Sequence, residues 1–369
     1  MLKRIAAAVA ALLLLPAVSV KASSPPDLSA VSAILMDAES GRVLFEKNAH
    51  EERAIASITK LMTALVAAES GHDPSEMVTV RPEWTGIEGS SIYLQPGEVV
   101  SFETLLYGLL LNSGNDAAVA LSAFCSGSVD AFVGQMNQYA RKLGMLHTHF
   151  SNPNGLSEAG HYSTAYDMVL LARACINNDL VAKITATKSI KLGTRTFSNH
   201  NKLLWYYKDC TGMKTGFTEA AGRTLVSSAQ RNGQTLIAVT LNAPDDWNDH
   251  ASLLDYGFEK FPRKILCNAE TLFFQVPLHG SLKRFMPANV DSCVYYPLTE
   301  GEHVRSRIEV DVPVKTPVKK GEYLGTLSFY LGDSLIGETQ VIASEVAFHD
   351  IADSKTNKEH LRLFLKKIT

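Results

Sequence analysis

The sequence predicts an α+β protein, in which an antiparallel five-stranded sheet with a helical lobe is followed by a small β-rich domain. Strand-like alternation at both ends of the first domain flanks a middle with helical periodicity. After Pro262 the pattern becomes strand-like throughout. A length of 369 residues with 46% hydrophobic residues is sufficient for two such domains. We expect the first domain at residues 23–262 and the second at residues 266–348.

The N-terminus has the features of an export signal. Lys3-Arg4 precedes an apolar run, residues 5–18, which is shorter than the roughly 20 residues of a membrane span. Small residues suited to cleavage follow, either Ala17-Val18-Ser19 or Val20-Lys21-Ala22. We therefore predict a signal peptide at residues 1–22 and an exported protein, at the extracytoplasmic face of the membrane or in the periplasm or cell wall. An uncleaved anchor is the alternative.

The first domain is predicted to contain two hairpins around a helical middle. Alternating residues place strands at residues 32–37, 42–46, 224–230 and 235–242. Asn232-Gly233, between the last two, is a strong indicator of a hairpin turn. Helical spacing places helices at residues 57–69, 102–111, 115–125, 128–143, 164–175 and 247–261. If both hairpins join one sheet, a cleft lies between the sheet edge and the helical lobe.

The second domain is expected to consist of strands. Ile308, Val310 and Val312 alternate with acidic residues, which predicts a half-buried strand. Two more strands, residues 324–330 and 335–343, flank a turn at Gly332-Asp333.

The last residues, 357–369, are expected to form an amphipathic helix. Leu361, Phe364, Leu365 and Ile368 fall on one stripe, opposite Arg362, Lys366 and Lys367. Such a helix could associate with an anionic membrane surface, and a helix docked on the protein is the alternative.

Charge and composition exclude several classes of function. A net charge of −3 leaves no basic excess to neutralise phosphates, so we expect no nucleic-acid partner. The five cysteines include no C-x-x-C pair, and we expect buried thiols, with a Cys267–Cys293 disulfide as an open alternative. His147, His149 and His161 occur without an H-E-x-x-H motif, so we expect no metal and no cofactor.

Ser57-Ile58-Thr59-Lys60 is the first candidate for catalysis. On a helix, residues three apart share a face, so Lys60 would lie beside Ser57 with about 4.5 Å of axial rise between them. A serine hydroxyl is a poor nucleophile until a base removes its proton. Lysine becomes that base when burial or a second cation lowers its pKa, and Lys214 could be that cation.

Ser113-Gly114-Asn115 follows an apolar run, residues 105–111, where a helix is expected to end. A hydroxyl at Ser113 could pass a proton to a leaving amine, and Asn115 could hold Lys60 or the substrate backbone. Alone, the tripeptide is equally typical of a turn that begins a helix.

Lys214-Thr215-Gly216 precedes the second hairpin and is expected on a strand at the sheet edge. Lys214 and Thr215 could bind a substrate carboxylate, while Gly216 leaves room for a substrate strand. The backbone N–H groups of Ser57 and Phe217 are candidates for an oxyanion hole. Alone, this tripeptide is also typical of an ordinary turn.

In this order, the three segments resemble those of low-molecular-weight penicillin-binding proteins, specifically secreted D-alanyl-D-alanine carboxypeptidases. The likeness extends to residues 151–156, 161–168, 253–258 and 318–321, and covers about residues 30–348. It implies a β-lactamase/transpeptidase-like fold for the first domain. It also implies that Ser57 attacks the D-Ala-D-Ala bond of a peptidoglycan stem peptide, with Lys60 as base and Ser113 as proton relay. Lys214 and Thr215 would anchor the carboxylate, and β-lactam antibiotics would acylate Ser57.

Three alternatives remain. A class A β-lactamase is disfavoured, because the region between Ser113 and Lys214 lacks an E-x-x-L-N pattern and Gly114 stands where Asp is usual. A D,D-endopeptidase shares the three segments, but the extra C-terminal domain favours a carboxypeptidase. A non-catalytic wall-binding protein would have no need for the Ser57–Lys60 pair.

Overall fold

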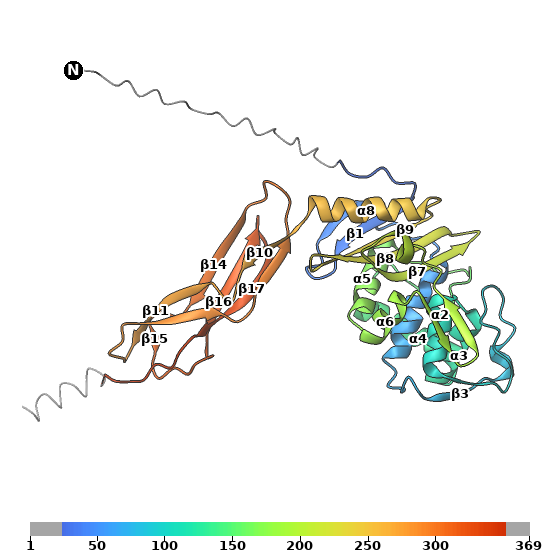
Figure 1. Cartoon of the computed structure of the whole chain (residues 1–369), viewed down its shortest axis with the longest axis horizontal. Coiled ribbons are helices and arrows are strands. Elements are labelled where there is room, and N and C mark those ends of the chain that lie inside the picture. The colour runs from blue at the N-terminus through green and yellow to red at the C-terminus, as the bar shows by residue number, and fades with distance from the viewer. Residues whose placement is uncertain (1–23, 352–369) are drawn as a thin grey trace, which may run out of the picture.

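The computed structural model describes residues 24–351. The predicted signal peptide, residues 1–22, and the predicted terminal helix, residues 357–369, lie outside these residues. The described chain forms two bodies, an α+β domain and an elongated β domain, placed side by side along the longest axis (Figure 1). No single helix in the described part is long and apolar enough to cross a membrane. One pair of helices, α3 (Asn115–Ser126) and α4 (Val129–Lys142), is long and apolar enough when taken together, but it is bent by 87°.

A five-stranded antiparallel sheet organises the first domain, in the order β2-β1-β9-β8-β7. Its strands are β1 (Ser32–Asp37), β2 (Val43–Lys47), β7 (Cys210–Thr218), β8 (Gly222–Arg231) and β9 (Gln234–Leu241). Asn232 and Gly233 have φ angles of 52° and 75°, as the tight turn between β8 and β9 requires. The predicted sheet is confirmed, with the strand that carries Lys214 at one edge.

Helices cover both faces of this sheet (Figure 1). One face packs against α8 (Asp246–Lys260), and the other packs against the helical lobe. The helices of the lobe are α1 (Lys60–Ala68), α2 (Phe102–Leu111), α3 (Asn115–Ser126), α4 (Val129–Lys142), α5 (Ala165–Ile176), α6 (Asp179–Ala186) and the short α7 (Leu203–Tyr206).

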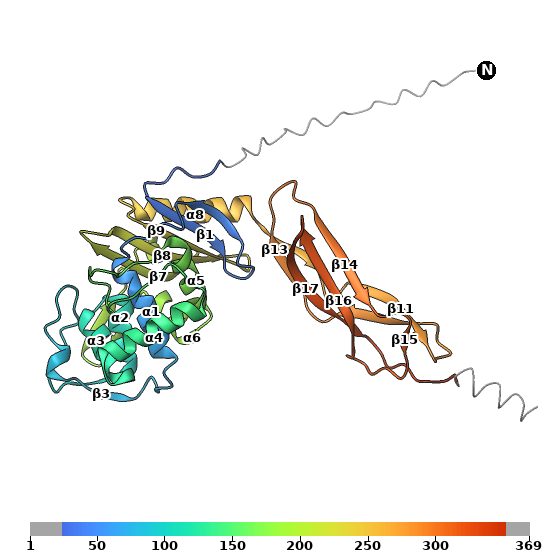
Figure 2. The same ribbon diagram turned by 180° about the vertical axis from the view of Figure 1, so that it is seen from behind.

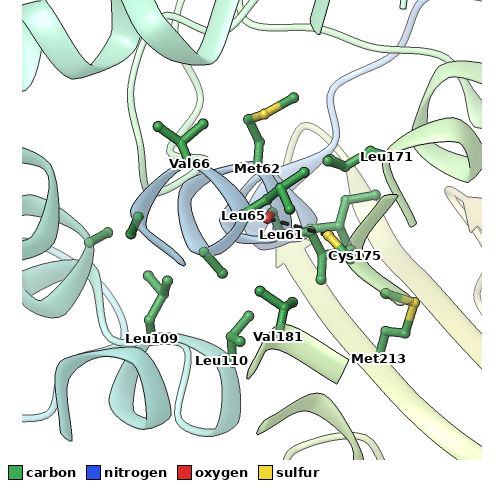
Figure 3. Close-up of a cluster of buried hydrophobic side chains, with 14 of the residues drawn as sticks. Leu61, Met62, Leu65, Val66, Leu109, Leu110, Leu171, Cys175, Val181 and Met213 are labelled. Carbon is green, nitrogen blue, oxygen red and sulfur yellow. Dashed lines mark hydrogen bonds between the residues drawn. The ribbon is translucent and has the colours of Figure 1, made fainter. Parts of the chain in front are cut away.

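The central helix of the lobe is α1, which is surrounded by the other helices (Figure 3). Its Leu61 and Leu65 side chains are buried against Leu109 of α2, Leu171 of α5 and Val181 of α6. Burial of each such side chain contributes about 1.5–3 kcal/mol. The apolar packing therefore holds α1 firmly, and with it the lysine at its N-terminus.

The N-terminus of α1 differs from the sequence expectation. Residues 56–59 form a 3-10 turn, η1 (Ala56–Thr59), and the α-helix begins only at Lys60. Two short hairpins were also not predicted, because strands of three or four residues carry too little alternation. They are formed by β3 (Met77–Thr79) with β4 (Val99–Ser101), and by β5 (Ser189–Leu192) with β6 (Arg195–Ser198). A second 3-10 turn, η2 (Pro82–Trp84), lies between β3 and β4.

The second domain is built from two sheets (Figure 2). The smaller one pairs β10 (Arg263–Cys267) with β13 (Val294–Pro297). The larger has the order β14-β16-β17-β12-β11-β15. Its strands are β11 (Phe273–His279), β12 (Phe285–Val290), β14 (Val304–Val310), β15 (Val314–Lys315), β16 (Tyr323–Leu331) and β17 (Ser334–Ala343).

Two predictions for the second domain were wrong in part. Ile308 on β14, an edge strand that pairs only with β16, is 46% exposed, and Val312, which lies beyond the end of that strand, is 56% exposed. Cys267 and Cys293 are free thiols, as expected, and the alternative disulfide between them is not formed. All five cysteines were expected to be buried. Cys175 and Cys267 are buried, whereas the other three thiols are half-buried.

Candidate active site

The site begins at the turn that precedes α1. Ser57 lies in η1 and Lys60 is the first residue of α1, so the tight turn brings Lys60 Nζ to 2.9 Å from Ser57 Oγ. The backbone of Ala56 has a φ of 49°, a conformation that residues other than glycine rarely adopt. Strained backbone of this kind is often found next to a reactive group, where the surrounding structure enforces it.

Lys60 is buried completely, although it carries an amine. Its Nζ lies 2.7 Å from Asn115 Oδ1 and 2.5 Å from the Asn154 carbonyl oxygen. Burial lowers the pKa of Lys60 well below its usual value, the charge of Lys214 lowers it further, and Asp116 opposes them. A neutral amine has two N–H donors and one lone pair. If the two N–H groups of the neutral amine bond to the two carbonyl oxygens, its lone pair is left to accept the proton of the Ser57 hydroxyl.

Asn154 belongs to a tight loop within residues 151–156, a segment that the family resemblance included but in which no residue was predicted to belong to the site. Gly155 has a φ of 82°, and a Cβ there would overlap the Ala56 carbonyl oxygen. His161 lies against the same region, with Nε2 2.8 Å from Thr59 Oγ1. Burial lowers the pKa of His161 to about 4, so this ring is a neutral positioning group at physiological pH.

Ser113-Gly114-Asn115 forms the entry to α3. Ser113 has a φ of 60° and is nearly buried, and Gly114 is the residue before the first helical turn. Asn115 donates from Nδ2 to the Glu88 carbonyl while its Oδ1 accepts from Lys60. Asp116 accepts hydrogen bonds from the backbone of Ile92 and Leu94 and from the Ser91 hydroxyl. This network fixes the loop that contains Ser90 over the site.

Lys214-Thr215-Gly216 lies on β7, the edge strand nearest to η1. Lys214 is 1% exposed, donates to the Thr215 carbonyl, and has its pKa lowered to about 7 by burial. Gly216 is required by space, because a Cβ there would lie 2.9 Å from the backbone nitrogen of Ser57. Phe217 is 66% exposed at the end of this segment.

A cavity of about 360 Å³ opens between β7, η1 and the entry to α3. Five of the predicted residues line it: Ser57, Ser113, Thr215, Gly216 and Phe217. The other three, Lys60, Asn115 and Lys214, lie buried behind its wall. Six lining residues were not predicted: Ser90, His200, Lys202, Arg223, Asp246 and Trp247. They come from four segments with no motif of their own, and only the fold brings these segments together.

The arrangement is suited to acyl transfer. A serine hydroxyl faces a cavity, a buried amine of lowered pKa lies beside it, and backbone N–H groups of η1 and β7 lie at the same wall.

Comparison with protein families agrees with this chemistry. The family model described as D-alanyl-D-alanine carboxypeptidase, Peptidase S11, matches residues 19–245. The chain belongs to this carboxypeptidase family. A second model, described as the C-terminal domain of penicillin-binding protein 5, matches residues 271–347. The predicted family and fold class are therefore confirmed.

Individual members of the family show the same extent of similarity. The chain is 33% identical to D-alanyl-D-alanine carboxypeptidase DacF of Bacillus subtilis, over 86% of this chain and 85% of that protein. It is 35% identical to DacC of Escherichia coli, over 87% and 84%. The crystal structure of penicillin-binding protein 5 from Haemophilus influenzae superposes with a TM-score of 0.72 and 29% identity, covering 88% of this chain and 99% of that one. The similarity thus spans both domains.

Proposed function

We propose that the protein removes the terminal D-alanine from peptidoglycan stem pentapeptides through an acyl-enzyme at Ser57, and so limits cell-wall cross-linking. The observation that carries this proposal is the 2.9 Å contact between Ser57 Oγ and the buried amine of Lys60. It is supported by membership of the carboxypeptidase family.

In the first half of the reaction, Lys60 Nζ takes the proton of the Ser57 hydroxyl. Ser57 Oγ then bonds to the carbonyl carbon of the penultimate D-Ala. The backbone N–H groups of Ser57 and Phe217 stabilise the oxyanion, while Lys214 and Thr215 hold the terminal carboxylate. When the C–N bond breaks, the leaving amine takes a proton through Ser113. Free D-Ala and a Ser57 ester are the products of this half.

In the second half, a water molecule attacks the ester carbonyl carbon and the bond to Ser57 Oγ breaks. The oxygen of the water leaves in the carboxyl group of the shortened peptide, and one proton of the water restores the Ser57 hydroxyl. A β-lactam antibiotic opens its ring on the same serine, and the resulting ester hydrolyses slowly. The steps proposed above use only the assigned side chains, backbone N–H groups and water.

The location follows from the same proposal. An enzyme that acts on the cell wall must be exported, in agreement with the signal peptide predicted at residues 1–22. In this proposal, residues 23–262 form the catalytic domain and residues 266–348 form the second domain. We also propose that residues 357–369 associate with the membrane surface.

Mass spectrometry of the purified mature protein with diacetyl-Lys-D-Ala-D-Ala tests the activity. Wild type should release one D-Ala, and Ser57→Ala should release none. Absence of release by wild type that still binds penicillin covalently would contradict the carboxypeptidase assignment and favour an endopeptidase. Rapid turnover of the chromogenic cephalosporin nitrocefin would instead favour a β-lactamase.

A further inference from the structure

We propose that a groove in the second domain binds a neutral sugar ring of the glycan strand of peptidoglycan. The groove is a cavity of about 490 Å³ lined by residues of β16 and β17, which are neighbouring strands (Figure 2), and of the segment after β12. No residue of the first domain lines it, so it is separate from the catalytic cavity. The choice of this glycan rests on the proposed function, which places the enzyme on peptidoglycan.

The strand register places three polar side chains on one face of the larger sheet. Thr326 of β16 lies opposite Gln340 of β17. Residues two apart on a strand point to the same face, so Glu338 projects on the same side as Gln340. All three side chains line the groove. Among the described residues, no hydrogen bond holds the side-chain amide of Gln340 or the carboxylate of Glu338.

A bulge brings an aromatic ring to the same groove. Tyr323 precedes Thr326 by three residues, a spacing that places side chains on opposite faces of a regular strand. The register shifts between Tyr323 and Gly325, and the Tyr323 hydroxyl lies 2.9 Å from Thr326 Oγ1. Tyr323 is 57% exposed, and within residues 24–351 no other aromatic ring or cation stacks on it. The ring is therefore available to a ligand.

A fixed carboxylate also belongs to the groove. Asp291 Oδ1 accepts hydrogen bonds from the Thr339 hydroxyl at 2.7 Å and from the backbone nitrogen of Gln340 at 3.2 Å. The hydrogen bond from Thr339 is the main cause that lowers the pKa of Asp291, so this carboxylate is charged at neutral pH. In the described part of the chain, no group donates to Asp291 Oδ2. This oxygen is therefore an open acceptor.

An exposed ring beside open donors and acceptors is suited to a sugar. The C–H face of a pyranose ring packs on an aromatic ring, and each sugar hydroxyl both donates and accepts hydrogen bonds. Asp291 and Glu338 can accept from such hydroxyls, whereas the amide of Gln340 can do both. The Tyr323 ring supplies the apolar surface.

Other classes of ligand fit this groove less well. An anion is disfavoured, because two carboxylates and no lysine or arginine line it. A metal ion is disfavoured because no group of three His, Cys, Asp or Glu side chains that could hold one occurs within residues 24–351. A basic peptide side chain would use the carboxylates but not the N–H donors of Gln340, since an ammonium group has no acceptor.

A glycan site here would give the enzyme a second hold on its polymeric substrate. Stem peptides are attached to the glycan strand, so a strand bound by the second domain raises the local concentration of stem peptides for the first domain. The two domains would then recognise different parts of one polymer.

Isothermal titration calorimetry of the mature protein with chitotetraose, a neutral tetramer of N-acetylglucosamine, tests the proposal. Wild type should bind with an affinity that changes little between low and high salt, because the ligand carries no charge. Tyr323→Ala should weaken binding about tenfold, as expected for a lost aromatic contact. Gln340→Ala should weaken it about fivefold, as expected for a lost hydrogen bond. Circular dichroism shows whether each variant is folded.

Phe273→Ala is the matched control. Phe273 is 60% exposed on β11 of the same sheet but does not line the groove, so this variant should keep the wild-type affinity. Absence of binding by folded wild type would overturn the proposal, and so would wild-type affinity in both Tyr323→Ala and Gln340→Ala.

A second ligand separates a sugar site from a basic-peptide site. Binding of tetralysine in place of chitotetraose, with loss of that binding in Glu338→Gln, would overturn the proposal in favour of a basic peptide. None of these measurements depends on turnover. Failure to release D-Ala, with binding of chitotetraose intact, would therefore contradict the proposed function and not the glycan site.

Discussion

At the scale of single residues, the site depends on the buried amine of Lys60, whose hydrogen-bond partners do not include a carboxylate. Lys60 is surrounded by two carbonyl acceptors and one hydroxyl, and the nearby positive charge of Lys214 further disfavours its protonation. Burial of an amine under these conditions favours the neutral form, which is the form that can accept a proton. The chemistry of Ser57 therefore follows from the surroundings of Lys60 more than from Ser57 itself.

Replacing Lys60 tests whether it is the base. Lys60→Ala should slow acylation by fluorescent penicillin by about 10²–10⁴-fold, the usual contribution of a general base. The rate is measured by gel fluorescence after timed labelling. Lys183→Ala, which removes an exposed lysine from the helical lobe, should label at the wild-type rate. Fast labelling of Lys60→Ala would exclude Lys60 as the base.

The pH dependence of acylation should shift in opposite directions in two variants. Activity requires neutral Lys60, so the rate should rise with pH through the lowered pKa of this residue. Lys214→Gln removes a charge that lowers this pKa, so the acidic limb of the profile should move to higher pH. Asp116→Asn removes a charge that raises it, so the limb should move to lower pH. Stopped-flow acylation across pH measures both, and shifts of the same sign would contradict this electrostatic account.

At the scale of elements, a loop and a helix meet at the nucleophile. The apolar face of α1 anchors Lys60 from one side, and the loop at residues 152–155 supplies a carbonyl from the other. The loop approaches η1 so closely that only a glycine fits at position 155.

Gly155→Ala tests this close approach. The added methyl group would meet the Ala56 carbonyl, and the positive φ of 82° disfavours alanine as well. We expect a loss of roughly 2 kcal/mol or more in the free energy of unfolding, with slower acylation. Urea denaturation measures the first and penicillin labelling the second.

Gly134→Ala is the control for this change. Gly134 lies inside α4, has no atom within 4 Å of an added Cβ, and does not have a positive φ. Alanine should therefore stabilise that helix by about 0.5–1 kcal/mol. Equal stability of the two variants would show that the loop can rearrange around position 155.

At the scale of the whole molecule, Arg42 is one of two arginines that join the domains, the other being Arg263 of β10, which pairs with Glu39. Arg42, in the turn before β2, donates to the Pro297 carbonyl and forms a two-fold contact with the Glu302 carboxylate. Its guanidinium also stacks near Phe261 and Tyr296, at 5.2 Å and 5.4 Å from their ring centres. The hydrogen bonds from Arg42 hold the pKa of Glu302 below its usual range. This contribution is therefore present at neutral pH and is lost as the pH falls into the acidic range.

Arg42→Ala should loosen the contact between the domains without changing turnover of a small substrate. We expect faster proteolysis near Pro262. We also expect the free energy of unfolding to fall by about 1–3 kcal/mol, because the partly buried pair with Glu302 is lost. Limited proteolysis and calorimetry measure these effects. Arg305→Ala, which removes an exposed pair with Asp333 in the second domain, should leave both unchanged. Unchanged proteolysis of Arg42→Ala would show that other contacts suffice.

The C-terminal residues are tested by deletion. Removal of residues 357–369 should release the mature protein from membranes into the soluble fraction, because an amphipathic helix binds through its apolar stripe. Fractionation followed by penicillin labelling measures the distribution, and labelling confirms that the truncated enzyme is intact. An unchanged membrane fraction would contradict an anchor at this end.

The sequence by itself determined the family, the central sheet and the segments around Ser57, Ser113 and Lys214. These features have local signatures, since periodicity, turn residues and short motifs can be recognised within a few neighbouring positions. Only the tertiary structure decided which other groups surround the nucleophile. The Asn154 carbonyl accepts a hydrogen bond from the Lys60 amine, 94 residues away in the sequence. Every residue has a backbone carbonyl, so the residue type does not indicate this contact. Arg223 reaches the cavity because β8 lies next to β7, and the exposure of Ile308 follows from the edge position of β14. Both are consequences of strand order, which local pattern does not encode.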